Sequence, residues 1–264
     1  MTLNMLIGIL EQGLIYGIMA MGLLITYRIL DFPDLTVDSS FPLGAAVSAT
    51  LTLQGVAPWL TLLIGCAAGG IAGLITGLIH VKCRVRDLLS GIITMTGLYS
   101  INLHIAQNKA NLPLFGGDTL FRNAFTKSLP KAISPYTTLI IILLIALIAK
   151  ILLDLFLRTK CGYLLRAAGD NPSVVTTLSR DQGTVKILGL IIANALVALA
   201  GAVMCEQDEI WQESRYFSEV RMNELYDDGR TRGIDGPVEW ARLEAEARKM
   251  LESGLELADR VEAA

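Results

Sequence analysis

Five long stretches of apolar residues constrain this chain more than any other feature. Each is close to the roughly 20 residues that an α-helix needs to cross a hydrocarbon core about 30 Å thick. Backbone groups in lipid must find hydrogen-bond partners within their own segment, which an α-helix provides. The sequence therefore predicts an all-α fold, a polytopic bundle of transmembrane helices. The five stretches are Met5–Tyr27, Pro58–Val81, Leu88–Gln107, Tyr136–Leu157 and Ile187–Cys205.

A sixth stretch, Val37–Leu53, is shorter, and polar residues and a proline interrupt its start. Two interpretations stay open. The stretch is either a broken or re-entrant segment that lines a path, or an ordinary short span whose polar start lies at the membrane interface. In a helix that starts here, Asp38 would be suited to the N-cap position. About six membrane segments are expected in total.

The charge of the chain changes sign near Cys205. Residues 1–205 hold 14 basic and 9 acidic side chains, whereas residues 206–264 hold 8 basic and 16 acidic ones. We therefore divide the chain into a transmembrane domain, 1–205, and an acidic soluble tail, 206–264. Within the tail, Val238–Val261 has apolar residues near heptad spacing and is expected to form an amphipathic helix. A surface helix is favoured over a dimerising coil because Gly254 falls on the apolar stripe.

Short basic loops indicate the orientation, because cytoplasmic loops carry an excess of Lys and Arg. With six crossings, two basic loops fall on one side, which we expect to be cytoplasmic, and the N-terminus lies outside. The loop Asn108–Pro135 is basic as well but lies on the outer side, and its amphipathic residues are compatible with an interfacial helix. The basic residues of the two cytoplasmic loops are Lys82, Arg84 and Arg86, then Arg158, Lys160, Arg166, Arg180 and Lys186.

Glycines spaced by four residues are expected to be contacts between helices. Such residues share one face of a helix and let the backbone of a neighbour approach closely. The first apolar stretch has Gly13 and Gly17 at this spacing. The stretch Pro58–Val81 carries a longer row, which is Gly65, Gly69, Gly73 and Gly77.

Nothing in the sequence indicates catalysis by this chain. The phosphate-binding pattern GxxxxGK[ST] does not occur, and neither does a pair of carboxylates or a Ser-His-Asp set with catalytic spacing. The cysteines are far apart, so we expect neither a zinc site nor a disulfide framework. We predict a protein that is not an enzyme and that binds no metal or cofactor. The cysteines are Cys66, Cys83, Cys161 and Cys205.

Polar side chains inside membrane segments are costly and therefore mark candidate functional positions. Our candidates for a translocation path are Asp38, Ser39, Ser40 and Asn102. Lone amides and imidazoles such as those of Asn102, His104 and Asn194 also commonly join helices by hydrogen bonds. Glu11 lies near the outer interface, where an interfacial role is favoured over ligand binding.

The polar, basic loop Thr159–Lys186 is the most informative stretch for function. Leu164, Leu165 and Ala168 would form one apolar face of a short helix, which Pro172 would end. A short helix across the cytoplasmic face could receive force from a soluble partner. A plain solvated loop fits the same residues.

This loop resembles the coupling region of permease subunits of ABC importers of the branched-chain amino acid and ribose type. The family pattern is close to T-x-x-G-x-x-L-R-A-x-G-x-N. The matching residues are Thr159, Gly162, Leu165, Arg166, Ala167, Gly169 and Asn171, followed by Gly183 and Lys186. The stretch from Gly13 to Asp38 and the sequence Gly44-Ala-Ala also look familial. Within the family the chain is most similar to an uncharacterised subgroup linked with amino acid uptake, including aromatic amino acids. The resemblance covers Gly8 to Gln207.

The resemblance implies a multi-pass permease subunit in the bacterial cell membrane that takes part in ATP-driven import of a small solute, an amino acid or a related compound. It implies a separate cytoplasmic ATPase that holds ATP and Mg²⁺, a second permease copy in a homodimer, and an external solute-binding protein. Lipid surrounds the subunit, and no nucleic acid is involved. Carried over by position, the coupling contact would run from Gly162 to Asn171. Arg166 would pair with a carboxylate of the ATPase or cap its own loop.

Other interpretations stay open. A secondary transporter or channel subunit could have a similar number of spans, and a membrane-anchored interaction protein could work through the acidic tail. Family members continue into at least two further spans where this chain has its tail. A truncated or fused permease fragment without native function is therefore a further alternative.

Overall fold

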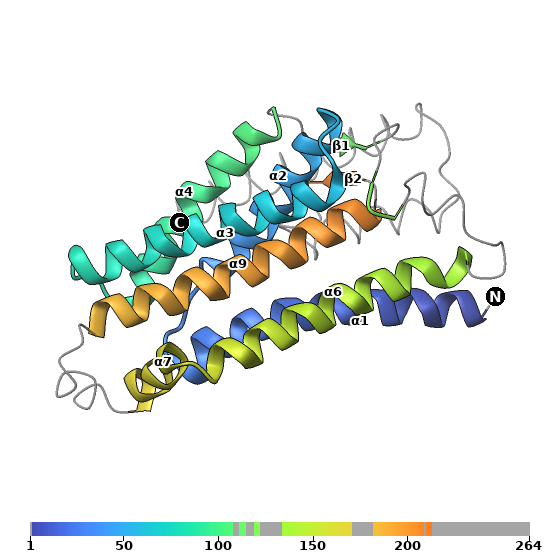
Figure 1. Ribbon diagram of the computed structural model, residues 1–264. Coiled ribbons are helices and arrows are strands. Elements are labelled where there is room, and N and C mark those ends of the chain that lie inside the picture. Colours follow the sequence, from blue (N-terminus) through green and yellow to red (C-terminus); the bar gives the residue numbers. More distant parts are fainter. Residues whose placement is uncertain are drawn as a thin grey trace, which may run out of the picture. The chain divides into compact units, whose positions relative to one another are not determined.

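The computed structural model describes residues 2–107, 111–114, 119–121, 134–170, 182–208 and 210–212, which belong to one compact unit, Met1–Phe217. The tail helix that we predict at Val238–Val261 lies outside the described residues. The unit is a bundle of α-helices (Figure 1), which confirms the predicted fold class. Its elements are α1 (Thr2–Leu23), the π-helix η1 (Leu24–Ile29), α2 (Val37–Leu53), α3 (Pro58–Lys82), α4 (Asp87–Ile105), β1 (Asn111–Pro113), α6 (Ser134–Leu157), α7 (Lys160–Asp170), α9 (Gln182–Asp208) and β2 (Ile210–Gln212).

Five of the described helices are long and apolar enough to cross a membrane. They are Met5–Ile29 (α1 with η1), α3, α4, Tyr136–Leu157 of α6 and Gly183–Asp208 of α9. They coincide with the five apolar stretches, to within a few residues at their ends.

The stretch Val37–Leu53 forms an unbroken helix rather than a broken one. α2 has 17 residues and a length of about 25 Å, and it includes Pro42. The irregular backbone precedes it, between η1 and Val37. Thr36 occupies the N-cap position, so the expectation that Asp38 would be the N-cap is wrong. Asp38 lies in the first turn of the helix, where a negative charge is favourable.

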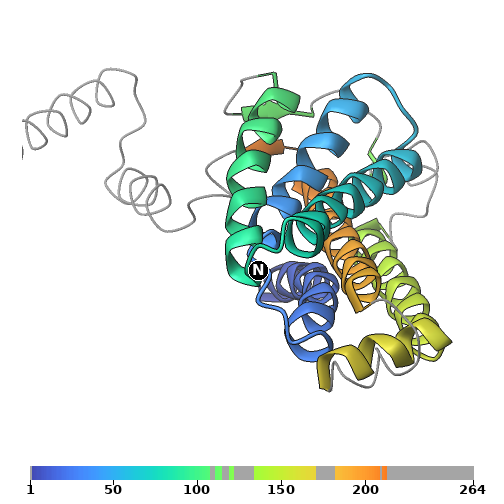
Figure 2. The same ribbon diagram turned by 90° about the vertical axis from the view of Figure 1, so that its left-hand side faces the viewer.

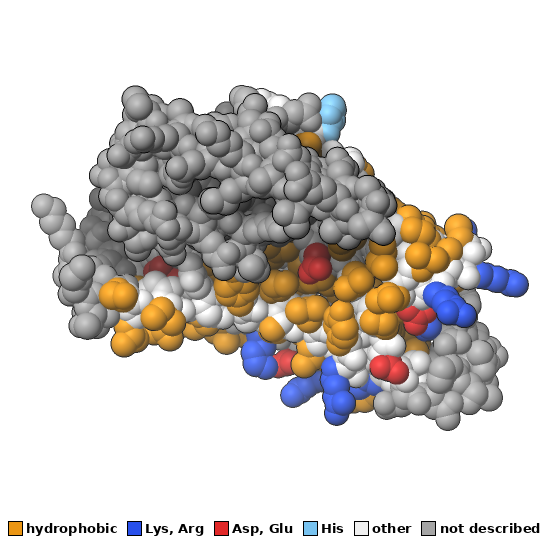
Figure 3. All heavy atoms as spheres, turned by 180° about the vertical axis from the view of Figure 1, so that it is seen from behind, with side chains coloured by type: hydrophobic (Ala, Val, Ile, Leu, Met, Phe, Trp, Pro, Cys, Tyr) orange, Lys and Arg blue, Asp and Glu red, His pale blue; other side chains and the backbone are white. Residues whose placement is uncertain are grey.

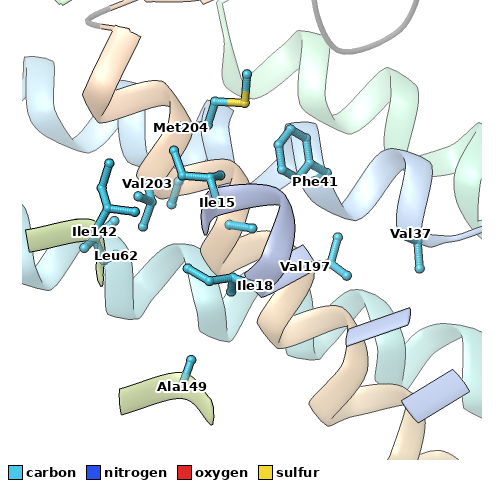
Figure 4. Packing of buried hydrophobic residues seen from close by; sticks show 12 residues of the cluster. Ile15, Ile18, Val37, Phe41, Leu62, Ile142, Ala149, Val197, Val203 and Met204 are labelled. Atoms are coloured by element: carbon cyan, nitrogen blue, oxygen red, sulfur yellow. The ribbon is translucent and has the colours of Figure 1, made fainter. Parts of the chain in front are cut away.

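Helix α9 is the centre of the bundle. It packs against α1, α2 and α3, and α6 packs alongside α1 (Figures 1 and 2). Buried apolar side chains from five helices meet around it, and the close-up in Figure 4 shows most of them. They include Ile15 and Ile18 of α1, Phe41 of α2, Leu62 of α3, Ile142 of α6 and Val197, Val203 and Met204 of α9.

The glycine row of α3 faces α9. A Cβ atom at Gly73 would collide with the carbonyl oxygen of Leu190, and one at Gly69 would collide with that of Asn194. At Gly65 the nearest atoms belong to Ala202 and Gly44, and at Gly77 they belong to Ile187. Absence of side chains at these positions therefore lets the two helix backbones approach closely.

The glycines of α1 behave differently. A Cβ atom at Gly13 or Gly17 would meet nothing within 4 Å, and both residues are exposed. The expectation that they form a helix contact like that of α3 is wrong within this chain. Their spacing is the same, but the face of α1 that packs inward is the one with Ile15 and Ile18.

A short antiparallel ladder joins the segments that follow α4 and α9. Leu112 of β1 pairs with Trp211 of β2, and Asn111 pairs with Gln212. Residues 119–121 of the loop predicted to hold an interfacial helix are not helical, and most of that loop lies outside the described residues.

The described surface is largely hydrophobic, as lipid contact requires. In Figure 3 hydrophobic side chains form a broad band, and Lys and Arg gather toward the end of the bundle that carries α7. Helix α6 has the most uniform outer face. Its exposed residues include Ile140, Leu143, Leu144, Leu147, Ile148, Ile151, Leu152 and Leu155.

Candidate functional site

Helix α7 is the first part of the candidate site. It lies across one end of the bundle, from the end of α6 toward η1 (Figure 2). The chain turns from α6 into α7 at Thr159, whose hydroxyl accepts a hydrogen bond from the Gly162 backbone N–H at 3.4 Å. The helix ends at Asp170, so Asn171 of the predicted coupling segment lies outside the described residues.

The two faces of α7 have different surroundings. Leu165 and Ala168 are buried in an apolar cluster that includes Leu30, Leu157 and Leu190. This cluster joins α7 to η1, α6 and α9. A displacement of α7 would therefore reach three other elements at once.

The outer face of α7 carries Tyr163 and Arg166, which are both exposed. Ala167, between the two faces, is partly buried. The arrangement leaves a guanidinium group and an aromatic ring available to a protein outside the membrane. Of the predicted coupling residues, Leu165 therefore faces the bundle and Arg166 faces away from it.

Two glycines hold α7 close to its neighbours. Gly162 is buried against the backbone of Leu157 at the end of α6. A Cβ atom at Gly169 would collide with the carbonyl oxygen of Ile29. The contact between α7 and the end of η1 therefore depends on the absence of a side chain at Gly169.

Beyond this contact the chain runs through the irregular segment, residues 30–36, to a buried polar cluster. Asp34, only 1% exposed, is the centre of this cluster. Its Oδ1 atom accepts a hydrogen bond from the Thr36 backbone N–H at 2.9 Å, and its Oδ2 atom accepts one from Asn194 Nδ2 at 2.8 Å. The Ser40 hydroxyl donates to Asn194 Oδ1 at 2.6 Å. The Asp34 cluster thereby ties the irregular segment and α2 to α9.

Neighbouring helices complete the surroundings of Asp34. The hydroxyls of Thr36 and Thr76 lie 2.9 Å apart and join the irregular segment to α3. On α4, a Cβ atom at Gly91 would lie 2.9 Å from the Leu35 nitrogen and 3.5 Å from Asp34 Oδ1. Residues of α2, α3, α4 and α9 therefore surround the segment that holds this buried carboxylate.

The predicted path residues fall into two groups. Asp38 is exposed, whereas Ser39, Ser40 and Asn102 are buried. The Ser39 hydroxyl donates to the Met95 carbonyl at 3.0 Å, and Asn102 Nδ2 donates to the Ser39 carbonyl at 3.0 Å. Ser39 and Asn102 therefore hold α2 and α4 together, and Ser40 belongs to the Asp34 cluster. A role of these residues in translocation stays a prediction.

At the same end of the bundle as α7, the His80 ring makes contacts that connect several elements. Its Nδ1 atom lies 2.9 Å from the Val85 carbonyl oxygen, to which it must donate, because a carbonyl can only accept. The Nε2 atom then accepts from Lys186 Nζ at 3.3 Å. Asp87 lies 3.3 Å from Nδ1, and Phe32 packs edge-on against the ring with 5.1 Å between centroids. His80 thus connects α3, α4, α9 and the irregular segment.

A second buried carboxylate lies at the opposite end of the bundle. Glu206 of α9 is fully buried and accepts hydrogen bonds from the Thr61 hydroxyl, from Ser48 Oγ at 3.1 Å and from the Leu120 backbone N–H at 3.0 Å. Next to it, Gln207 Nε2 donates to Glu11 Oε2 at 3.1 Å. Glu11, in the first half of α1, is therefore joined to α9 by a hydrogen bond.

Sequence patterns alone do not single out Asp34, His80 or Glu206. The position of Asp34 in the sequence does give an indication. An acidic residue in a short link between two membrane segments is held close to both helices, so its burial between them could be expected. Glu206 was assigned to the soluble tail because the boundary was placed where the charge changes. Its burial depends on donors from α2, α3 and the loop after α4, which only the tertiary structure brings together.

Comparisons with known proteins relate the bundle to transport systems. Residues 5–217 match the family described as "Branched-chain amino acid transport system / permease component". The tyrosine transport system permease protein of Clostridioides difficile is 43% identical over 201 residues, which are 76% of this chain and 64% of that protein. The chain thus spans slightly under two thirds of this relative.

Two further relatives are more distant. The probable branched-chain amino acid transport permease protein LivH of Methanocaldococcus jannaschii is 32% identical over 219 residues, covering 76% of this chain and 67% of that protein. The ribose import permease protein RbsC of Escherichia coli is 25% identical over 203 residues, covering 76% of this chain and 61% of that protein. No solved structure gives a significant match.

Proposed function

The chain belongs to the family of permease components of branched-chain amino acid transport systems, and we propose that it is the membrane-spanning subunit of an ATP-driven importer of an amino acid. It is a multi-pass protein of the cell membrane with five described helices of spanning length and composition. ATP hydrolysis would take place in a separate cytoplasmic ATPase, and a second permease copy and an external solute-binding protein would complete the importer. Tyrosine is the first candidate substrate, because the relative that is 43% identical is named for tyrosine transport.

The observation that carries this proposal is the two-sided environment of α7. Its inner face, with Leu165, is buried among residues of α6, α9 and the segment after η1, and its outer face exposes Arg166. A partner that binds the outer face would push on all three elements. A transporter whose ATPase is a different chain needs an element of this kind, whereas an ion-driven transporter does not require one.

Capture of the ATPase tests the proposal. The tagged full chain is purified in detergent from its native host, and co-purifying ATPase subunits are identified by mass spectrometry. Arg166→Glu reverses the charge of the outer face of α7 without touching buried residues. We expect it to lower ATPase capture about thirtyfold or more, because a buried interfacial charge pair left unmatched costs about 2 kcal/mol or more.

The matched control is Arg86→Glu, which makes the same charge change at an exposed residue just before α4. It should leave capture unchanged, since a negative charge near a helix N-terminus is tolerated. Uptake of radiolabelled L-tyrosine by the same cells tests the substrate. Tyrosine uptake that continues without any associated ATPase would favour the secondary-transporter alternative and contradict the proposal.

A further inference from the structure

A hydrogen bond between side chains joins the end of α3 to the start of α9. The two helix ends lie side by side (Figure 1), and a Cβ atom at Gly77 of α3 would lie 2.9 Å from the Ile187 side chain of α9. The hydrogen bond, 3.3 Å long, connects His80 Nε2 of α3 with Lys186 Nζ of α9. Lys186 is the last residue of the sequence pattern around the coupling region, and the contacts of α7 do not explain its presence there.

The position of the ring hydrogen follows from the two sides of the imidazole. On one side, Nδ1 of His80 lies 2.9 Å from the Val85 carbonyl oxygen and 3.3 Å from Asp87 Oδ1. A carbonyl oxygen and an ionised carboxylate can only accept, so Nδ1 carries the hydrogen. On the other side, the Lys186 ammonium can only donate. The contact at Nε2 therefore requires the free electron pair of a neutral ring.

A second hydrogen on the ring would act on one side only. It would turn Nε2 into a donor that faces the donor of Lys186, with two positively charged groups opposed across 3.3 Å. Nδ1 would keep its hydrogen and its contact with Val85, and Asp87 would become the partner of a charged ring. Protonation of His80 therefore breaks the contact with α9 and keeps the contact with the turn between α3 and α4.

The surroundings of His80 allow such a change of charge. The His80 side chain is 15% exposed, so water at this end of the bundle can reach it. Histidine is the side chain whose charge ordinarily changes between about pH 5 and 8. Among the described residues, the charged groups in contact with the ring are Asp87 of α4 and Lys186 of α9.

The other charged residues described around this site are exposed or hold other partners. The irregular segment meets the ring with the apolar side chain of Phe32. Of the acidic residues of that segment, Asp31 is exposed, and Asp34 is buried in its own cluster of hydrogen bonds. The exposed basic residues at the end of α3 and in the following turn are Lys82, Arg84 and Arg86.

We propose that His80 and Lys186 form a latch that a cytoplasmic proton opens. With a neutral ring, the His80–Lys186 latch ties the start of α9 to the turn between α3 and α4. When Nε2 of His80 takes a proton from cytoplasmic water, the Lys186 ammonium is released to solvent and the start of α9 loses this attachment.

The latch lies next to the coupling helix. Val185, which precedes Lys186, packs in the same apolar cluster as Leu165 of α7. Release of Lys186 would therefore loosen the part of α9 on which α7 rests. The latch itself does not depend on the proposed function. Its consequence does rest on that function, and it is slower import when the cytoplasm becomes acidic.

The position of the ring hydrogens is the first test. The chain has two histidines, so His104→Gln leaves His80 as the only ring in a full chain labelled with ¹⁵N-histidine and purified with a tag that lacks histidine. At about pH 8 we expect the nitrogen spectrum of a ring with hydrogen on Nδ1 and a free Nε2, and at about pH 5 that of a ring with hydrogen on both nitrogens. Hydrogen on Nε2 alone at the higher pH would overturn the proposal.

The contact between the two side chains is the second test. Lys186→Met keeps the length of the side chain and removes the ammonium. At about pH 8 it should lower the unfolding temperature of the full chain in detergent by about 3 °C, the order of shift for one charged hydrogen bond in a chain of this size. At about pH 5 it should leave that temperature unchanged or raise it, because the two charges then repel. Lys82→Met is the matched control, since it removes the charge of an exposed lysine at the same helix end, and its effect should be the same at both pH values.

His80→Gln separates the latch from other effects of pH. A glutamine amide both donates and accepts but does not titrate, so Lys186→Met should have the same effect at both pH values in this background. Equal effects of Lys186→Met at the two pH values in the parent chain would contradict the proposal, and so would a pH dependence that persists in the His80→Gln chain. The first test leaves both latch residues unchanged, so it remains decisive if a variant at position 186 does not fold.

The two tests use the purified chain and need neither the ATPase nor tyrosine. A latch that opens with pH in a chain that captures no ATPase would reject the proposed function and leave the latch in place. ATPase capture by a chain whose His80 ring fails the tests would reject only the latch.

Discussion

At the scale of single residues, buried carboxylates connect the helices of this protein. Asp34 receives hydrogen bonds from Thr36 and Asn194, and Glu206 receives them from Ser48, Thr61 and Leu120. A buried charge is tolerated when several donors surround it. Each carboxylate thereby joins segments that are more than 80 residues apart in at least one of these contacts. Their removal should therefore affect the bundle and not merely a local turn.

The Asp34–Asn194 pair yields a charge-swap prediction. Asn194→Asp replaces the amide that donates to Asp34 with a second carboxylate, and two carboxylates about 3 Å apart cannot both be ionised. The variant should be less stable by about 3 kcal/mol, the order of cost for an uncompensated buried charge. The double variant Asp34→Asn/Asn194→Asp restores one donor facing one acceptor and should recover most of the loss. Thermal unfolding in detergent measures both.

The swap is informative because the single variants Asp34→Asn and Asn194→Asp destabilise the protein for different reasons. Asp34→Asn alone removes the charge and leaves two amides face to face, and it should be milder than Asn194→Asp. If the double variant were no more stable than Asn194→Asp, the hydrogen bond between positions 34 and 194 would not be the interaction that matters.

At the scale of elements, small residues decide which helices touch. Gly69 and Gly73 of α3 lie against the α9 backbone, and Gly44 of α2 and Gly201 of α9 do the same for the contact between α2 and α9. Without a hydrophobic drive between helices in lipid, packing at such close range and interhelical hydrogen bonds stabilise the bundle. The same glycines also bring Asn194 within reach of Asp34 and Ser40.

Valine substitutions separate packed from unpacked glycines. Gly73→Val places a side chain where the Leu190 carbonyl oxygen lies, so we expect α3 and α9 to be forced apart and the purified chain to aggregate or unfold at a clearly lower temperature. Gly17→Val makes the same chemical change on the exposed side of α1 and should leave the unfolding temperature nearly unchanged. Size-exclusion chromatography and thermal unfolding in detergent compare the two. Similar damage in both variants would contradict the packing described here.

Helix α7 yields a prediction about coupling. Gly169→Ala adds one methyl group where the Ile29 carbonyl oxygen lies, which should lift the end of α7 from η1 while leaving Tyr163 and Arg166 exposed. We expect the variant to capture the ATPase as the parent chain does and to lose most of its tyrosine uptake. Gly97→Ala, at a glycine with open space, is the control and should keep both activities. Parallel loss of capture and uptake would show that α7 has no separate coupling face.

At the scale of the whole molecule, α7 and most of the basic residues that the structure describes lie at one end of the bundle. The end of α3 with Lys82, the following loop with Arg84 and Arg86, and the turn with Arg158 all lie there. The positive-inside rule assigns this end to the cytoplasm. The Glu206 network then lies near the outer surface, and the Asp34 cluster lies on the cytoplasmic side.

Native cysteines test this orientation without any mutation. Cys83 and Cys161 are exposed at the basic end, whereas Cys205 is buried at the other end. A membrane-impermeant maleimide should label Cys83 and Cys161 in inside-out vesicles and leave them unlabelled in intact cells, as read by peptide mass spectrometry. Labelling of both cysteines in intact cells would reverse the orientation and place α7 outside, out of reach of any cytoplasmic ATPase.

The apolar stretches by themselves indicated the extent of the five helices of spanning length that the structure describes. Lipid imposes a fixed length and an obligatory helix on each, so local composition is sufficient, and even the short segment Val37–Leu53 has the bounds that the sequence indicated. The glycine spacing of α3 likewise predicted a close contact between helices. The sequence pattern around Arg166 indicated the permease family. The spacing could not say whether a glycine face is packed, since Gly13 and Gly17 have the same pattern and face outward.

Only the tertiary structure decided which polar residues meet. Asp34 pairs with Asn194 across 160 positions, and Glu206 joins α2, α3 and the loop after α4 although its neighbours in sequence suggested a soluble tail. The direction in which a side chain points also depends on which face of its helix the neighbours cover. For that reason Ser39 and Asn102 are buried between helices, and Ser100 and His104 remain on the open side of α4. Burial of a polar group is a property of the assembled bundle, because its hydrogen-bond partners come from other helices.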